Sequence, residues 1–530
     1  MPRINPTLFD QLMAPEYQSE FANIRRGLEK EGLRVNKQGQ ISQKDHPIAL
    51  GSALTHPSIT TDYSEALLEF ITPALNSPEQ TADYLYRLHA FTQQNLDDEI
   101  IWGCSMPCHI ANELDIRIAE YGASNVGQLK HVYRHGLWHR YGRLMQSIAG
   151  IHYNFSMPDS FWPKYQQLLN EQTTEGQSLQ DFRSEKYFGL IRNFKRYSWL
   201  LIYLFGASPA VSASFIDQQN TKLNNSLKGT LFAPKGTSLR MSDLGYQNSA
   251  QSDLRICYNS LENYITTLTH AVNTPHQAYQ AIGMMDNNEH FKQLNTNLLQ
   301  IENEFYSDIR PKRTAEGEEK PLEALSSRGV EYIEVRCLDI NPFLTTGIDA
   351  QQIAFMDTFL TFCLLADSPQ VEPIECNRLA QNLVGMAYEG SNPEKRILLE
   401  GKSFSIQQEG SAVFEQLAMV AKMLDESQST DLYSASVTHF QTLLAEPERL
   451  PSQQQIQWMS ENNASFQDFG LEISHRHADE LTNFSLSGEF MDEMAKISQL
   501  SIGQQQSIEK SDNIIFINYL ESFSKKKVEK

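Results

Sequence analysis

The sequence predicts an α+β fold in which strands with one polar face pack on helices. Two observations support this class. Several segments alternate between polar and apolar residues, as strands with one buried face do, and the clearest are 24–35, 150–156 and 330–338. From residue 349 onward, most of the chain has the pattern of helices instead. The length of 530 residues and the hydrophobic content of 40% are sufficient for a large core.

Charge and hydrophobic pattern limit the classes of partner that the protein could bind. The net charge of −21 argues against a nucleic-acid or anionic-membrane partner, but it leaves a small anionic substrate open. Residues 1–10 lack the apolar region of a signal peptide, and the apolar run 199–205 is too short to span a bilayer. We therefore expect no membrane association.

The six cysteines are too few for a disulfide framework in a chain of this length. Cys104, Cys108 and His109 match a zinc site poorly because no second ligand pair lies nearby. We expect a reduced, cytoplasmic protein.

The first 204 residues predict three strands and three helices. Strands are expected at 24–35, 67–73 and 150–156, and helices at 77–98, 126–149 and 179–204. Segment 67–73 is a short apolar run stopped by Pro73, which favours a strand. The alternative is a helix with Asp62, Glu65 and Glu69 on one face. Ser77-Pro78-Glu79 is a helix start, with an N-cap, Pro at the first position and an acid in the first turn.

Helix 126–149 is unusually basic. Its basic side chains are either exposed to solvent or, on one side of the helix, turned toward phosphates. Farther along, we expect a mobile loop at 217–237, a helix at 253–272, a loop at 314–328 and the strongest strand at 330–338. The later helices are expected at 349–366, 376–389, 410–426, 431–446, 452–461 and 489–500.

Two carboxylates in the first strand suggest a cation site. Glu29 and Glu31 are two residues apart, so both point to the same face of the strand. Like charges this close repel each other unless a positive group lies between them. A divalent cation is the simplest such group.

Other predicted strands and loops supply the remaining oxygen-rich set. The candidate ligands are Glu29, Glu31, Asp62, Glu69, His152 and Glu334. Oxygen donors favour hard cations such as Mg²⁺, with Mn²⁺ as the alternative. Five carboxylates exceed the need of one ion and suggest two or more ions that bridge nucleotide phosphates. The chain has no Walker A sequence, so metals and arginines would hold ATP. The alternative to a metal site is that these acids are ordinary exposed residues.

Several long motifs give the chain a family resemblance. They read RGLEKEGLRV, GSALTHPSITTDYSEALLEFITP, SMPCHIA, GIHYNFS, YLFGASPA, TSLRMSDLGY, LQIENEFY with IRPKR, and GVEYIEVRCLDINPF. In this order they resemble the proteobacterial glutamate–cysteine ligases, over about residues 24–345 and more weakly to 400. Beyond residue 400 the resemblance is slight.

The resemblance implies a fold and a reaction. The fold would be a curved, largely antiparallel sheet forming a funnel like the catalytic domain of glutamine synthetase, surrounded by helices. The reaction would use ATP to join the γ-carboxylate of L-glutamate to the amine of L-cysteine through an acyl phosphate, which is the first step of glutathione synthesis. We expect this step only, carried out by a monomer. Residues 1–400 would form the catalytic domain, and 401–530 a helical region packed on it.

The resemblance also implies roles for single residues. Glu29, Asp62 and Glu69 would hold one ion and Glu31, His152 and Glu334 another, with Glu29 and Glu334 able to share a third. Arg240 and Arg336 would lie near the glutamate and the transferred phosphate. The cysteine pocket would contain Tyr133, Tyr246 and Tyr306, and the nucleotide would lie near Gln146 and Asn154. Two alternatives stay open: a related carboxylate–amine ligase with another amine acceptor, and a non-catalytic binding protein on the same scaffold.

Overall fold

The structure is a computed structural model. It describes residues 3–170, 177–216, 223–244, 251, 254, 256–317 and 319–525.

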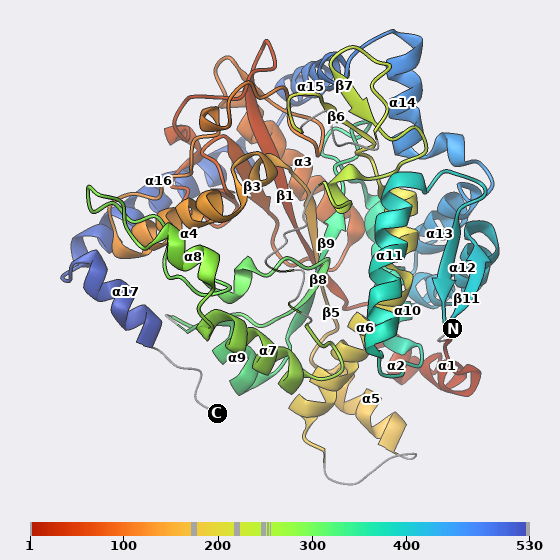
Figure 1. Cartoon of the computed structure of the whole chain (residues 1–530). Coiled ribbons are helices and arrows are strands. Elements are labelled where there is room, and N and C mark those ends of the chain that lie inside the picture. Colours follow the sequence, from red (N-terminus) through yellow and green to blue (C-terminus); the bar gives the residue numbers. More distant parts are fainter. Residues whose placement is uncertain are drawn as a thin grey trace.

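A sheet of seven strands forms the centre of the molecule (Figure 1). Its strands are β1 (Arg25–Asn36), β2 (Ile59–Thr61), β3 (Leu67–Ile71), β4 (Glu99–Ile101), β5 (Ile151–Ser156), β8 (Ile309–Lys312) and β9 (Tyr332–Leu338). They run in the order β2-β3-β1-β5-β9-β8, and β4 pairs with the C-terminal end of β1. Each pair is antiparallel, and the sheet is open. The α+β class and the antiparallel sheet are confirmed, and the segment predicted at 67–73 forms a strand, β3, that ends at Ile71.

Helices surround the sheet. Those before residue 400 are α1 (Pro6–Leu12), α2 (Pro15–Phe21), α3 (Pro78–Gln94), α4 (Asn125–Tyr141), α5 (Phe161–Asn170), α6 (Leu179–Phe205), α7 (Leu261–Asn273), α8 (Gln277–Ile282), α9 (Pro321–Arg328), α10 (Ala350–Leu365) and α11 (Pro373–Glu389). Those after it are α12 (Ile406–Gln428), α13 (Leu432–Thr442), α14 (Pro451–Glu461), α15 (Phe466–Asn483), α16 (Gly488–Ser511) and α17 (Phe516–Lys525). Two small hairpins, β6 (Ala210–Ser212) with β7 (Thr230–Phe232) and β10 (Arg396–Leu399) with β11 (Lys402–Ser405), complete the fold.

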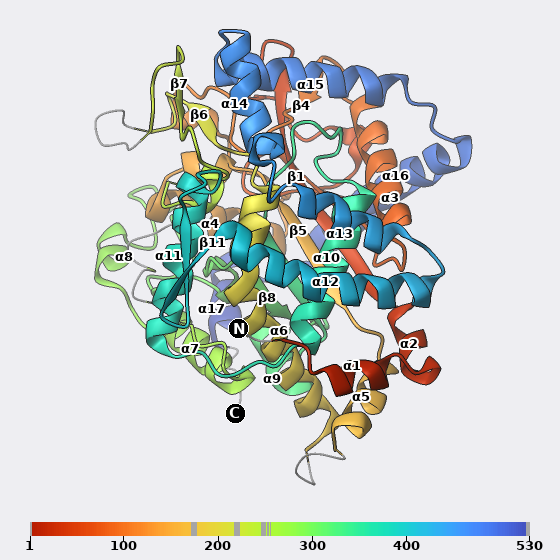
Figure 2. The same ribbon diagram turned by 90° about the vertical axis from the view of Figure 1, so that its right-hand side faces the viewer.

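One face of the sheet is buried beneath α3, α6 and α10, and α12 and α13 form a further layer over α10 (Figure 2). Buried apolar residues such as Leu28, Phe155 and Val335 form this core. The layer also contains a charged pair, in which Arg26 of β1 lies 2.8 Å from Asp357 of α10 and both side chains are fully buried. The Tyr153 hydroxyl donates to the same carboxylate at 2.7 Å. No helix in the described part of the chain is both long and apolar enough to cross a membrane.

The helices after residue 400 pack on elements that precede it. Helix α15 lies against α3 and β4, and α17 lies against α4. Helix α16 holds the loop before β2, where the Ser52 backbone N–H donates to Ser501 Oγ at 3.0 Å. Leu520 of α17 is buried against Val132 of α4. The division at residue 400 stays a prediction.

Several element boundaries differ from the sequence prediction. Helix α4 ends at Tyr141 and not at 149, because Gly142 adopts φ 78° and ends the helix. Helix α7 begins at Leu261 rather than 253. The expected loops contain β7 and α9, and residues 217–222 lie outside the described part. The strands β4, β10 and β11 and the helices α15 and α17 were not predicted.

Candidate active site

Strand register brings the predicted acidic residues together. On β1, Glu29 lies opposite His152 of β5, and Glu31 lies opposite Glu69 of β3. On the next pair, Asn154 of β5 lies opposite Glu334 of β9. Directly opposed residues of antiparallel strands have neighbouring side chains. The sheet therefore gathers residues that are far apart in the sequence on one polar face.

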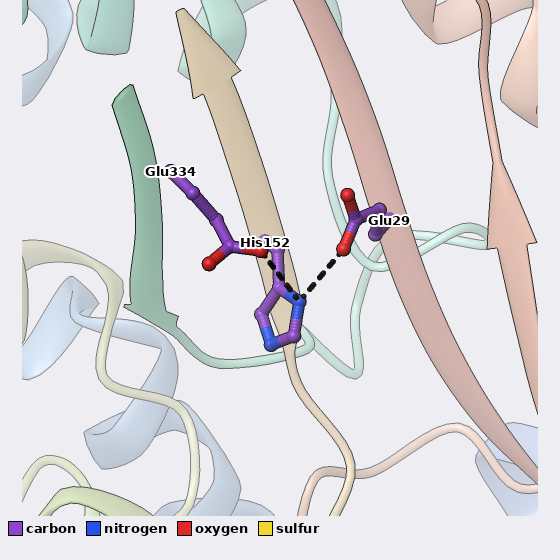
Figure 3. Close-up of side chains that lie close together, drawn as sticks. All are labelled: Glu29, His152 and Glu334. Carbon is purple, nitrogen blue, oxygen red and sulfur yellow. Dashed lines mark hydrogen bonds and ion pairs between the residues drawn. The ribbon is translucent and has the colours of Figure 1, made fainter. Parts of the chain in front are cut away.

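The tightest group is Glu29, His152 and Glu334 (Figure 3). His152 Nδ1 lies 3.1 Å from Glu29 Oε2 and 4.0 Å from Glu334 Oε1. One candidate ligand atom from each residue lies within 4.8 Å of the other two. Two carboxylates and an imidazole this close form a donor set that suits a divalent cation.

The predicted partition placed Glu29 with Asp62 and Glu69, placed His152 with Glu31 and Glu334, and let Glu29 and Glu334 share a third ion. The observed group joins Glu29 to His152 as well as to Glu334. The physical reason is register, because Glu29 is the cross-strand neighbour of His152. Glu31 Oε1 is also near the ring, at 3.8 Å from His152 Nε2. The assignment of each acid to an ion stays a prediction.

The site lines a pocket of about 620 Å³. The predicted residues that line it are Glu29, Glu31, Asp62, Glu69, Tyr133, Gln146, His152, Tyr306, Glu334 and Arg336. Asn154 reaches its edge, where the side-chain amide donates to Glu29 Oε1 at 3.0 Å. Tyr246 lies outside the described residues.

Arg240 supports the pocket from behind. Arg240 is 1% exposed. Its guanidinium donates to the Arg336 carbonyl oxygen at 2.8 Å and lies 3.7 Å from Asp339. Gly150 leaves the space for this side chain, since a Cβ there would lie 2.0 Å from Arg240 Nη2. Arg240 is not among the residues that line the pocket in the described part of the chain.

The pKa values of the acids in the pocket are shifted in opposite directions. Burial raises the pKa of Glu69 well above its ordinary value, and the charges of Glu29 and Asp62 raise it further. Burial and Asp62 likewise raise the pKa of Glu31. Negative charge is therefore least compensated on the side of the pocket that holds these two acids.

Glu334 and Glu29 behave differently because they have positive or donor partners. Burial opposes the ionisation of Glu334, but Lys312 and Arg336, each 3.3 Å away, hold its pKa well below the ordinary value. Burial also opposes the ionisation of Glu29, but the hydrogen bond and the charge of His152, together with the charge of Lys312, lower its pKa.

The sequence raised the basic helix 126–149 as a face that could turn toward phosphates, but it gave no role to single cationic residues of this helix or of β8. Helix α4 contributes Lys130, Arg134 and Arg140, and β8 contributes Arg310 and Lys312. On α4 these residues recur at the spacing of one helical face, a signal that selects them from the other basic residues of the helix. Residues Gln251 and Glu304 also line the pocket. Nothing in the local sequence marks them.

Comparison with known proteins identifies relatives over nearly the whole chain. The family model described as glutamate-cysteine ligase matches residues 9–385. The chain is 46% identical to a protein named glutamate–cysteine ligase from Alcanivorax borkumensis, over 97% of this chain and 98% of the relative. It is also 46% identical to a protein of the same name from Pseudomonas putida, over 92% of each.

Solved structures show the same likeness. A crystal structure of glutamate–cysteine ligase from Francisella tularensis in complex with AMP aligns with a TM-score of 0.88 and 34% identity, over 95% of this chain and 98% of that one. A bifunctional glutathione synthetase from Pasteurella multocida aligns with a TM-score of 0.71 and 26% identity, over 89% of this chain and 55% of that one. The chain therefore belongs to the glutamate–cysteine ligase family.

Proposed function

We propose that the protein joins the γ-carboxylate of L-glutamate to the amine of L-cysteine with ATP, through γ-glutamyl phosphate, and releases ADP and phosphate. The observation that carries this proposal is the single pocket wall on which buried carboxylates, an imidazole and cations meet, in a chain of this family. A carboxylate is a poor electrophile, so phosphorylation has to precede attack by the amine. The full-length match to relatives named for this single ligation supports the first step of glutathione synthesis.

The residues present fit divalent cations, Mg²⁺ or Mn²⁺. Glu29, Glu31, Asp62, Glu69, His152 and Glu334 would hold them. Burial and the charges of neighbouring acids raise the pKa values of Glu31 and Glu69, and a bound cation would favour the charged form of each. Bound ions would offset the repulsion between the triphosphate and the glutamate carboxylate.

The chain's own cations would orient the two anionic substrates. Arg336 lies beside Glu334 on the pocket wall, and its planar guanidinium suits the oxyanion of a carboxylate or phosphate. Lys312 and Arg310 lie where the main pocket meets a second one of about 290 Å³. Leu268, Leu322 and Tyr332 line that second pocket. Its apolar lining beside cations favours it as the place for the base of ATP.

The tyrosines on the opposite wall would form the amine-acceptor side. Tyr133 of α4 and Tyr306 both line the main pocket, and burial raises the pKa of each hydroxyl. Both hydroxyls therefore stay protonated at neutral pH. Cysteine would lie between this wall and the acyl phosphate. We expect a monomer, which analytical ultracentrifugation tests directly.

Phosphate release from ATP tests the function. The purified protein is incubated with ATP, Mg²⁺ and glutamate, and a panel of amines that includes cysteine, alanine, glycine and ammonia is added one at a time. We expect release to depend on glutamate and to be fastest with cysteine, and mass spectrometry to detect γ-glutamylcysteine. Release that ignores cysteine but responds to another amine would favour the related ligase, and no release with any amine would favour a binding protein.

A further inference from the structure

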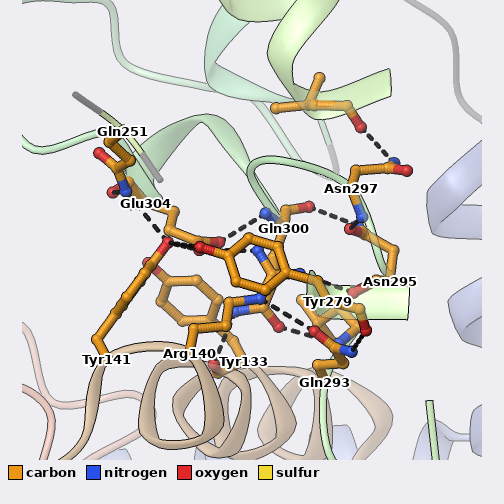
Figure 4. A network of polar contacts seen from close by, with 12 residues as sticks. Tyr133, Arg140, Tyr141, Gln251, Tyr279, Gln293, Asn295, Asn297, Gln300 and Glu304 are labelled. Carbon is orange, nitrogen blue, oxygen red and sulfur yellow. Dashed lines mark hydrogen bonds and ion pairs between the residues drawn. The ribbon is translucent and has the colours of Figure 1, made fainter. Parts of the chain in front are cut away.

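A buried charged pair lies beside the tyrosine wall (Figure 4). Arg140 of α4 and Glu304, in the 3-10 helix Glu302–Glu304, are 2.9 Å apart, and both side chains are fully buried. The Tyr141 hydroxyl donates to Glu304 Oε1 at 2.5 Å, and the Gln300 backbone N–H donates to Oε2 at 2.6 Å. Both carboxylate oxygens are therefore satisfied by protein donors.

The remaining donors of Arg140 fasten α4 to the segment before Glu304. Its Nε donates to Gln293 Oε1 at 3.0 Å, and Nη2 donates to the Asn295 carbonyl oxygen at 2.8 Å. The guanidinium lies 4.1 Å from the centre of the Tyr279 ring. Nearly every polar direction of this buried cation thus has a partner, which fixes its geometry.

The network extends to both described tyrosines of the proposed cysteine side. Gln300 Nε2 donates to the Tyr133 carbonyl oxygen at 3.2 Å. Gly136, one turn later on α4, permits this approach, because a Cβ there would lie 2.0 Å from Gln300 Oε1. Gln251 donates to the Tyr141 hydroxyl at 3.2 Å and accepts from the Tyr306 backbone N–H at 3.2 Å.

We propose that Glu304 and Gln300 are positioning residues for the amine substrate, which act by holding Tyr133 and Tyr306 at a fixed separation on the amine-acceptor side of the pocket. This inference rests on the proposed function and adds to it which residues set the acceptor site. Glu304 is an unsuitable cation ligand because its oxygens already have three donors. Its role follows from the backbone segments that it joins.

The first test is steady-state kinetics of Glu304→Gln. The amide keeps the size of the side chain but weakens the pair with Arg140. We expect the KM for cysteine to rise about tenfold, as for loss of one charge-assisted hydrogen bond. The KM values for glutamate and ATP and the Mg²⁺ dependence should change less than about twofold, because those ligands would bind on the sheet side of the pocket.

Gln300→Met is the second variant, because Gln300 does not line the pocket in the described structure. Any effect on cysteine has to pass through the two backbone groups that its side chain contacts, the Tyr133 carbonyl oxygen and the Leu294 N–H. We expect its KM for cysteine to rise about fivefold with kcat at saturating cysteine retained. Glu375→Gln is the matched control, since Glu375 forms a pair with Arg196 at 2.7 Å away from the pocket. It should lower the melting temperature and leave all KM values unchanged.

The outcomes separate this inference from the proposed function. If the wild-type protein shows no cysteine-dependent phosphate release, the proposed function fails. If the wild-type protein is active and Gln300→Met changes only the melting temperature, or raises the three KM values equally, the positioning role is wrong. A selective rise for cysteine in Gln300→Met supports the inference even if Glu304→Gln fails to fold.

Discussion

Two carboxylates on different walls of one pocket, Glu304 and Glu69, differ in the partners that the protein gives them. On the wall that contains Arg140 and Tyr141 of α4, called the network wall below, Glu304 has a guanidinium at 2.9 Å and two further donors. On the sheet wall, Glu69 has neither an ion pair nor a side-chain hydrogen bond among the described residues, and its pKa is raised well above the ordinary value. Both acids lie in the same cavity. The difference lies in whether the protein supplies the positive charge.

This contrast separates structure from ligand binding. A buried carboxylate with its own cation stabilises an arrangement of elements, as Asp357 does with Arg26 behind the sheet. A buried carboxylate without one costs stability until something positive arrives from solution. Glu69, which lacks such a partner, is therefore expected to matter for ligand binding and turnover, and Asp357 and Glu304 for folding or position. Glu29 and Glu334 do have protein partners, and their proposed role as ligands rests on their place beside His152 in the pocket.

The largest expected effect is loss of turnover on removing a charge from the sheet wall. Glu29→Gln and Glu334→Gln should each lower kcat by on the order of 10³-fold, because each removes a proposed ligand without changing side-chain size. Phosphate release at saturating substrates measures it. Glu331→Gln is the matched control on the segment leading into β9, since Glu331 is partly exposed and lies 3.7 Å from Arg313. Unchanged turnover in both ligand variants would show that the metal assignment is wrong.

The next effect is on stability alone. Asp357→Asn should lower the free energy of unfolding by about 3 kcal/mol, because it leaves the Arg26 guanidinium buried without its counter-charge. Urea denaturation followed by circular dichroism measures the loss. The double variant Arg26→Met with Asp357→Leu removes both charges and should recover much of it. A change of more than about twofold in the KM for any substrate in Asp357→Asn would contradict the prediction that this paired acid affects stability alone.

Local sequence was sufficient for part of this architecture. The alternation of polar and apolar residues placed Glu29 and Glu31 on one strand face, and both line the pocket. Helix starts such as Ser77-Pro78 were also predicted, as α3 shows. Signals for two other helices were present but overlooked. Pro321 with Glu323 begins α9, and Ser465 with Asp468 forms the capping box of α15.

Tertiary features could not be predicted from local patterns. Which strand lies beside β1 depends on sheet topology, and that register places Glu29 directly opposite His152. The Arg140–Glu304 pair joins residues 164 positions apart. Its members have no distinguishing spacing, so only the fold identifies them.

The smallest expected effect is on the pH dependence of stability. In the metal-free protein, Glu31 and Glu69 should destabilise the folded state where they are charged. Because the pKa values of Glu31 and Glu69 are raised in the folded state, these two groups bind more protons in the native protein than in the unfolded chain above pH 4.5. Their contribution to stability should therefore fall as pH rises from 4.5 through the raised pKa values, whereas histidines whose pKa values are lowered by burial, such as His46 and His477, act in the opposite direction below pH 6.5. The lowered pKa values of Glu29 and Glu334 act in the other direction, and their contribution is lost only as pH falls below 4.5.

Thermal denaturation with chelator or with Mg²⁺, across a series of pH values, measures this cost. Mg²⁺ at tenfold above its dissociation constant should stabilise the protein by about 1.4 kcal/mol, with the larger gain at higher pH. Glu69→Gln should flatten the pH dependence of the metal-free protein and reduce the gain from Mg²⁺, because the amide carries no charge to compensate. Equal pH slopes and equal Mg²⁺ gains in the wild-type protein and this variant would mean that Glu69 is an ordinary acid, and that the contrast between the two walls does not mark a cation site.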